Sequence, residues 1–185
     1  MKDSMGLFEK IATPLEGCFE IKPIVRSDNR GNFIKTFHEP SFRELGLTTD
    51  FKEEFHTISK KNVIRAMHFQ LPPEAHIKLV YCAEGKVMDV VLDLRKNSAT
   101  YGKFHVVELD STKGNSLYIP IGLAHGYKVL TERSVVIYKT TTVFSAACDT
   151  GILWNSCGID WQCNAPILSE KDTKLPTLAE FDSPF

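Results

Sequence analysis

Short hydrophobic stretches recur along most of this chain, and clusters of turn residues separate them. Within the stretches, β-branched and other apolar residues often occupy alternating positions, which is the pattern of strands with one buried face. Their spacing of roughly ten residues is typical of β-sandwiches and barrels. The predicted strands cover residues 21–26, 33–38, 56–60, 63–70, 77–83, 86–94, 104–109, 117–119, 126–130 and 134–142. The sequence therefore predicts an all-β protein built as a sandwich or a barrel.

Turn residues predict how consecutive strands connect. The Glu-Gly pair at 84–85 separates strands 77–83 and 86–94, which form the clearest predicted hairpin. Strands 126–130 and 134–142 are expected to form another hairpin. Further local signals are a strong turn at residues 28–32, before the return strand, and a short helix at residues 40–45 that Gly46 stops.

Composition and charge narrow the class of protein. The 185 residues are enough for one domain, expected to span 1–185, and 43% of them are hydrophobic. A net charge of -1 gives no electrostatic argument for a nucleic-acid or membrane partner. The N-terminus has no apolar segment typical of a signal peptide, and no stretch approaches membrane-spanning length, so a cytoplasmic location is expected. The odd number of cysteines, with no Cys-x-x-Cys pair, favours free thiols over a disulfide framework: Cys18, Cys82, Cys148, Cys157 and Cys163.

The segment from Gly114 to His125 carries the first chemical signal. Pro120 ends a short strand, because proline cannot donate to a sheet ladder, and Gly122 allows a tight bend before the histidine. The spacing of these four residues resembles the second sequence motif of the cupins, which are small double-sheet β-barrels of the jelly-roll type. Val129 stands where cupins usually carry asparagine. In a barrel the bend would direct His125 into the mouth, whereas in an ordinary hairpin it would lie on the surface.

The first cupin motif argues against a bound metal. Metal-binding cupins carry a histidine pair and then a glutamate at a fixed distance before a glycine, which Gly85 matches here. Lys78 occupies the glutamate position, and His68 and Gln70 occupy the histidine positions. An ammonium group has only donors and would repel a divalent cation. The sequence therefore predicts a metal-free cavity in which His68, His125 and Lys78 suit an anionic or enolate-like species.

Residues 65–70, Arg-Ala-Met-His-Phe-Gln, resemble the Arg-Gly-Leu-His-x-Gln signature of the dTDP-4-dehydrorhamnose 3,5-epimerases. Further matches, in order along the chain, are Arg30-Gly31 with Phe33, Lys78-Leu79-Val80, Asp89-Val90 with Asp93 and Arg95, Ile119-Pro120, Ala124-His125-Gly126, Tyr138-Lys139, Trp154-Asn155, and Leu168-Ser169 with Lys171-Asp172. The resemblance implies a cupin-type barrel with a few short helices, a homodimer, a nucleotide-sugar substrate and no cofactor.

The resemblance also implies catalytic roles. His68 would be the base that removes a proton next to the keto group of the sugar, and Asp172 would orient its ring. Lys78 would stabilise the enolate oxygen, and Tyr138 would return a proton from the opposite face. Each residue also has an ordinary structural reading: a core histidine, a turn aspartate, a surface lysine and a core tyrosine.

Other matched positions are expected to bind substrate. Arg30 and Arg65 would hold the nucleotide phosphates, because a guanidinium fork suits phosphate geometry, although Arg30 could equally be a solvated turn residue. The remaining predicted substrate-binding residues are Phe33, Lys35, Gln70 and His125.

Several positions depart from the family pattern. Lys35 replaces a glutamate expected near the nucleobase, and because a lysine only donates hydrogen bonds, this favours CDP over dTDP. A family run of Gln-Asp/Glu-Asn is Glu-Glu-Phe at residues 53–55, and Phe144 lacks a tyrosine hydroxyl. These changes favour an epimerase that acts on a different nucleotide sugar, or at one carbon only.

The predicted function is the epimerisation of a nucleotide-linked 4-keto-6-deoxy sugar at C3, C5 or both. Such an isomerase would serve the synthesis of lipopolysaccharide, O-antigen or another product that contains deoxysugars. Two alternatives remain from the sequence: a 3,4-ketoisomerase on the same scaffold, and a sugar-binding cupin without catalytic activity.

Overall fold

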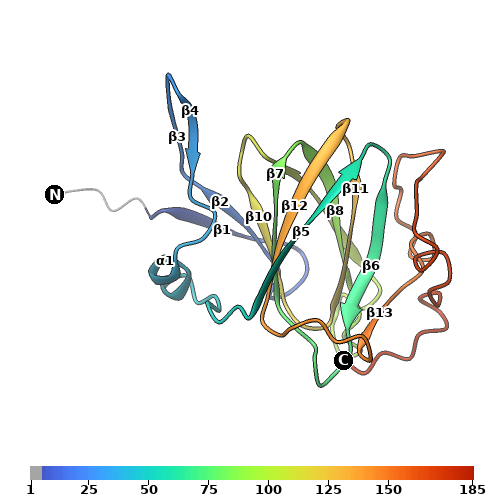
Figure 1. The fold of residues 1–185 in the computed structure, drawn as a ribbon. Helices are drawn as coiled ribbons and strands as arrows, with labels where there is room; N and C mark the ends of the chain where they lie inside the picture. The colour runs from blue at the N-terminus through green and yellow to red at the C-terminus, as the bar shows by residue number, and fades with distance from the viewer. Residues whose placement is uncertain (1–5) are drawn as a thin grey trace.

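The computed structural model describes residues 6–185, which consist mostly of β-strands and connecting segments (Figure 1). Within this range the one α-helix is α1 (Glu39–Glu44), which confirms the helix predicted before Gly46. The strands are β1 (Phe8–Ala12), β2 (Phe19–Pro23), β3 (Val25–Asp28), β4 (Gly31–Ile34), β5 (Glu53–Lys60), β6 (Ile64–Gln70), β7 (Lys78–Glu84), β8 (Lys86–Asp93), β9 (Phe104–Asp110), β10 (Ser116–Ile119), β11 (Leu123–Val129), β12 (Arg133–Thr140) and β13 (Asp149–Gly151). No helix in the described range is long and apolar enough to cross a membrane. The expectation that the chain starts without a signal peptide falls partly on residues 1–5, outside the described range.

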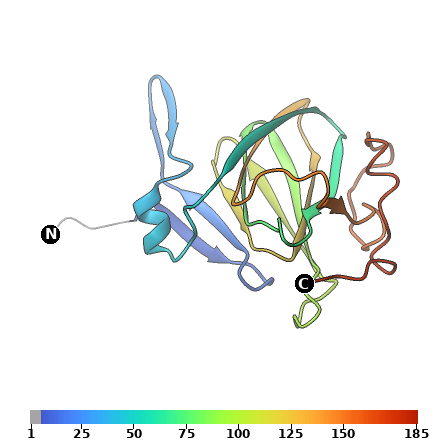
Figure 2. The same cartoon turned by 60° about the horizontal axis from the view of Figure 1, so that its bottom comes forward.

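Two antiparallel sheets face each other and form the barrel (Figures 1 and 2). The six-stranded sheet has the order β1-β2-β10-β7-β12-β5, and the five-stranded sheet has the order β13-β6-β11-β8-β9. Apolar side chains from both sheets, among them Val80, Leu117, Val91 and Tyr127, make one buried cluster between them. This arrangement confirms the predicted double-sheet β-barrel.

Two predicted hairpins are wrong, although their strands exist. β7 pairs with β10 and β12, whereas β8 pairs with β11 and β9, so the chain changes sheets at Gly85. β11 and β12 likewise belong to opposite sheets. The two connections pack against each other: the Lys86 N–H donates to Thr131 Oγ1 over 3.0 Å, and the Leu130 N–H donates to the Lys86 carbonyl over 3.0 Å. A turn signal marks where a strand ends, but it does not fix the strand's partner.

Apolar layers also cover the outer faces of the two sheets. Along β8, Val87 and Val91 point into the barrel, whereas Val90 and Leu92 pack outward against a cluster that includes Trp161. The C-terminal segment therefore covers the five-stranded sheet, as Figure 1 shows on the right. This burial on both faces explains why six of the nine residues 86–94 are apolar. The outer face of the six-stranded sheet is covered in part by α1, whose Phe42 is fully buried.

The hairpin of β3 and β4 stands away from the barrel (Figures 1 and 2). Its turn is the one predicted at residues 28–32: Asp28 Oδ1 accepts a hydrogen bond from the Arg30 N–H over 2.8 Å, and Gly31 has a φ of +121°. The return strand ends at Ile34, earlier than predicted, because the following residues lead into α1.

The close approach of β11 to β6 requires glycine at position 126. A Cβ added at Gly126 would lie 2.5 Å from the Cβ of Ala66 and 2.9 Å from the Arg65 carbonyl oxygen. We predict that Gly126→Ala lowers the free energy of unfolding by about 1–3 kcal/mol, because the strands must separate. Urea denaturation measures the change. Gly6→Ala is the control, because its Cβ would meet only the Phe8 carbonyl oxygen at 3.6 Å. Equal stability of the Gly126→Ala variant and the wild type would contradict the close packing.

Candidate active site

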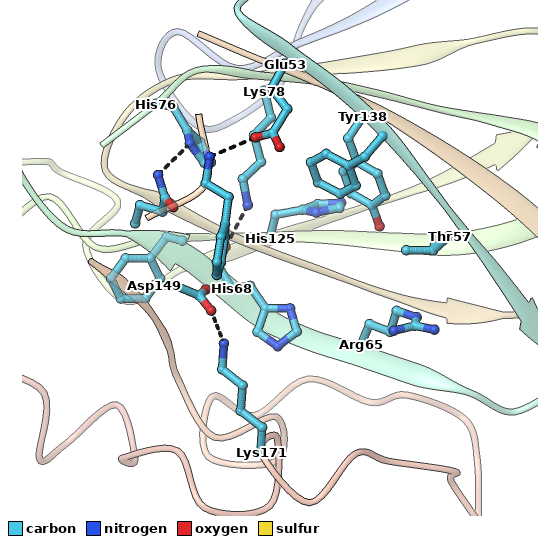
Figure 3. A pocket seen from close by; sticks show the side chains of 14 residues that line it. Glu53, Thr57, Arg65, His68, His76, Lys78, His125, Tyr138, Asp149 and Lys171 are labelled. Atoms are coloured by element: carbon cyan, nitrogen blue, oxygen red, sulfur yellow. Dashed lines mark hydrogen bonds and ion pairs between the residues drawn. The ribbon is translucent and has the colours of Figure 1, made fainter. Parts of the chain in front are cut away.

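A pocket of about 270 Å³ is lined by the five-stranded sheet and by β7, β12 and β5 of the six-stranded sheet (Figure 3). Of the sequence-predicted residues, six line it: Arg65, His68, Gln70, Lys78, His125 and Tyr138. Its other lining residues are Glu53, Phe55, Thr57, Phe69, His76, Phe144, Asp149 and Lys171. Asp172 adjoins this group through a hydrogen bond to His68.

Strand register brings the two predicted histidines together. β10 ends at Ile119, Gly122 has a φ of +88°, and β11 then places His125 directly opposite His68 of β6. Side chains of directly opposite residues lie on the same face of a sheet. His125 is only 3% exposed, so the bend directs it into the barrel, as predicted, and not to the surface.

His68 and Asp172 form a hydrogen-bonded pair. His68 Nε2 lies 2.7 Å from Asp172 Oδ1, and the aspartate is 3% exposed, whereas the histidine side chain is 30% exposed to the pocket. The carboxylate accepts a hydrogen bond, so the neutral imidazole carries its hydrogen on Nε2 and keeps a lone pair on Nδ1. The pair is therefore equipped to take up a proton and to stabilise the resulting imidazolium.

A second pair, His125 and Asp89, lies deeper. His125 Nε2 is 2.8 Å from Asp89 Oδ2, and both side chains are buried. Burial raises the pKa of Asp89 above its ordinary value, and the neighbouring His125 and Lys78 act in the opposite direction. Asp89 matches the family pattern in sequence, but it was not predicted as a site residue.

Lys78 supplies a buried cation. Its Nζ donates a hydrogen bond to the main-chain carbonyl of His68 over 2.9 Å, and the residue is 8% exposed. Burial lowers the pKa of Lys78 to about 8, and the charges of Asp149 and Asp89 limit the decrease. The ammonium group is therefore mostly charged at neutral pH and adjoins His68.

Tyr138 supplies a protonated phenol. It is 7% exposed, its ring stacks on Phe55, and its hydroxyl points toward Thr57 (Figure 3). Burial raises the pKa of Tyr138 well above its ordinary value, and the charge of Asp89 acts in the same direction. At neutral pH the residue is therefore a proton donor.

Gln70 lines the pocket, but its amide holds the neighbouring chain. Its Nε2 donates to the carbonyls of Glu74 (2.8 Å) and Val143 (3.2 Å), and its Oε1 accepts from the Ser145 N–H over 2.6 Å. The side chain thus fixes the segment that carries Phe144. Its predicted contact with substrate stays a prediction.

The structure does not bring three predicted substrate-binding residues to this pocket. Arg30 and Phe33 lie on the projecting β3–β4 hairpin, where Phe33 is 62% exposed and Arg30 pairs with Asp28 at 2.7 Å. Lys35 follows that hairpin and is not among the lining residues. Arg65 does line the pocket, where its Nε donates to Ser59 Oγ over 3.1 Å.

The sequence missed several lining residues. β5 begins at Glu53, three residues before the predicted strand, and alternation along β5 directs Glu53, Phe55 and Thr57 to one face. Asp149 and Lys171 form an ion pair in the pocket lining. Lys171 belongs to a matched motif but was not predicted as a site residue, and Asp149 carried no sequence signal. Burial lowers the pKa of His76 to about 3, so this lining histidine is neutral at physiological pH.

Within residues 6–185, no three or more His, Cys, Asp or Glu side chains gather in a way that would hold a metal ion. The prediction that the reaction needs no metal stays a prediction. The five cysteines, all in the described range, form no disulfide, as expected.

Comparison with known proteins identifies the family. The family model described as dTDP-4-dehydrorhamnose 3,5-epimerase matches residues 12–180. The chain belongs to this family. It is 41% identical over 174 residues to the dTDP-4-dehydrorhamnose 3,5-epimerase of Escherichia coli (strain K12), and the match covers 92% of this chain and 94% of that protein. The family explains why the ordered motif matches extend along nearly the whole sequence.

Solved structures agree with this assignment. The dTDP-6-deoxy-D-glucose-3,5-epimerase of Legionella pneumophila Philadelphia 1, solved with dTDP-4-keto-L-rhamnose, is 31% identical with a TM-score of 0.90, and the match covers 95% of each chain. ChmJ, a 3'-monoepimerase from Streptomyces bikiniensis solved with dTDP-quinovose, is 27% identical with a TM-score of 0.87, and covers 92% of this chain and 88% of that one. The predicted cupin-type fold and the predicted isomerase class are confirmed: the protein is an epimerase of deoxysugar biosynthesis.

The buried ammonium group predicts how activity depends on pH. The pKa of Lys78 is lowered to about 8, so its charge is lost as the pH rises through that value. If the charge stabilises the transition state, kcat/KM falls above pH 8 in the wild type. Lys78→Arg keeps a positive charge at every accessible pH, so this alkaline decline should disappear while the rate at neutral pH drops. An identical decline in both proteins would exclude Lys78 as its source.

Proposed function

We propose that this protein inverts C3, C5 or both in a nucleotide-linked 4-keto-6-deoxy sugar. One observation carries the proposal: a single pocket joins an imidazole oriented by a carboxylate, a buried ammonium and a buried protonated phenol. These are the three groups that proton exchange next to a ketone needs. His68, Lys78 and Tyr138 supply them.

The proposed reaction has two proton transfers at each inverted carbon. His68 Nδ1 takes the proton from the carbon beside the keto group, and the C–H electron pair moves into an enolate. Lys78 stabilises the charge on the enolate oxygen. Tyr138 gives its proton to the opposite face of that carbon, and the phenolate and the imidazolium then exchange protons with water. Asp172 keeps the imidazole in the orientation that the first step needs.

We propose dTDP as the nucleotide. The relatives from Legionella and Streptomyces were solved with dTDP-sugars. The sequence-based argument for CDP depends on Lys35 alone, whereas two relatives point to dTDP. CDP is therefore the alternative that a direct comparison of the two nucleotides must exclude.

The assignment of the base predicts a specific defect. His68→Asn should abolish incorporation of solvent deuterium at C3 and C5, because no other group accepts the carbon-bound proton. Nuclear magnetic resonance of substrate incubated in heavy water measures the exchange. His76→Asn is a matched control: this imidazole lines the same pocket but is neutral and is hydrogen-bonded to Gln70 and Thr142 instead of a carboxylate, so exchange should continue. Full exchange in a folded His68→Asn variant would exclude His68 as the base.

We also propose that the protein works as a homodimer in which the β3–β4 hairpin reaches the pocket of the second copy. The hairpin projects from its own barrel, and it presents Phe33 and Arg30 to solvent. An exposed aromatic residue and an arginine at the tip of a projecting hairpin suit contact with a ligand in a neighbouring pocket. This arrangement would give Arg30 and Phe33 their predicted roles in substrate binding.

Mixed subunits test this arrangement. Arg30→Ala weakens binding and His68→Asn abolishes the chemistry, but a dimer with one copy of each variant has one intact site if Arg30 acts on the partner. An equal mixture, reassembled at random, should therefore recover about a quarter of wild-type activity. Sedimentation measures the oligomeric state in the same samples. A mixture no more active than the average of the separate variants would show that Arg30 does not act across subunits.

A further inference from the structure

The wall of the pocket that carries Tyr138, the proposed acid, contains an aromatic contact that the proposed mechanism does not use. Phe55 and Tyr138 are directly opposite each other in the β5–β12 ladder. Their rings stack with centroids 4.7 Å apart and an interplanar angle of 9°. β5 is the edge strand of its sheet, so Phe55 forms the outermost layer of this wall. Figure 3 shows the hydroxyl of Tyr138 directed toward Thr57.

The ring of Tyr138 is held on two sides. The His125 ring meets it edge-on, with centroids 5.8 Å apart and an interplanar angle of 73°. His125 cannot move freely, because it is buried and hydrogen-bonded to Asp89. The Tyr138 ring therefore lies between the fixed His125 ring and the Phe55 ring. Phe55 limits how far the phenol ring can turn.

The exposures of the two rings show which one protects the other. Phe55 is 43% exposed, whereas Tyr138 is 7% exposed. The phenylalanine thus faces solvent at the pocket mouth and covers the phenol. A polar side chain at this position would neither stack on the ring nor exclude water from it. The sequence marked Phe55 as a departure from the family's asparagine, and the stack gives that departure a physical role.

We propose that Phe55 is a positioning residue for the proton-donating step: its ring holds the Tyr138 hydroxyl toward the sugar and excludes water from the phenol. This inference rests on the proposed role of Tyr138 as the acid. Removing the stack leaves the base and the enolate-stabilising lysine in place. The phenol then samples orientations from which its O–H proton cannot reach the carbon, and the enolate more often takes its proton back from the His68 side.

The test separates proton exchange from product formation. In heavy water, exchange without inversion needs only the base, whereas inversion also needs the acid. Phe55→Leu keeps an apolar side chain but removes the stacked ring. We expect it to slow product formation about two- to tenfold, the range that the loss of one aromatic stack allows, with little change in deuterium incorporation. Phe55→Tyr, which restores a stacked ring, should recover the rate.

A double-mutant comparison identifies the residue through which Phe55 acts. In a Tyr138→Phe background, Phe55→Leu should cause little further loss of product formation, because the hydroxyl that it positions is already absent. Phe144→Leu is the matched control: Phe144 is another exposed aromatic residue lining the pocket, but it does not stack on Tyr138, so its effect should add to that of Tyr138→Phe. Thermal unfolding of each variant checks the fold.

Four results would contradict the role of Phe55 or that of Tyr138. An equal loss of exchange and product formation, or a higher KM with unchanged kcat, would show that Phe55 contacts the substrate and would overturn the inference. Additive effects of Phe55→Leu and Tyr138→Phe would also overturn it. Undiminished product formation by Tyr138→Phe alone would instead overturn the assignment of the acid, so failure of the proposed function is distinguishable from failure of the Phe55 inference.

Discussion

The register of β11 against β6 is the constraint on which the site depends. It places His125 opposite His68, and it is fixed at a point where the strands approach too closely for any side chain at Gly126. The pairing becomes irregular between His125 and Tyr127, immediately after the histidine. A slip of one residue would turn His68 to the other face of the sheet, away from the cavity. The same pairing that builds the middle of the five-stranded sheet therefore also brings the two histidines of the pocket together.

Burial tunes those groups in opposite directions. It lowers the pKa of Lys78 to about 8, which is close to physiological pH. It raises the pKa of Tyr138, so the phenol stays protonated. Asp149 and Asp89 keep the ammonium charged in spite of its burial. Because the barrel fixes these charges before a ligand arrives, the site needs little reorganisation when negative charge develops on an enolate. Gln70 contributes indirectly, since its amide holds the segment that carries Phe144 at the rim.

The sequence predicted β5 to β12 well, because their alternating or continuous apolar residues lie between turn signals. It missed β1 and predicted one strand at 21–26 where the structure has β2 and β3. It failed at the connections around Gly85 and at residues 131–133, because sheet membership is a property of the whole barrel and a tight turn looks the same in a hairpin and in a corner between sheets. The motif matches found six of the residues that line the pocket. They did not locate Arg30, Phe33 or Lys35 relative to the pocket, because the local sequence does not show that the hairpin leaves the barrel. Asp149 and Lys171 were missed for a related reason: their pairing is long-range.

Incubation of the wild-type protein with dTDP- and CDP-linked 4-keto-6-deoxyglucose in heavy water, followed by nuclear magnetic resonance of the sugar, tests the proposed epimerisation. We expect deuterium at C3, C5 or both of the dTDP-sugar, inversion at the labelled carbons and a keto group that stays at C4. Labelling of the CDP-sugar alone would contradict the proposed nucleotide. A product with its keto group at C3, or no deuterium in either sugar, would contradict the proposed epimerisation.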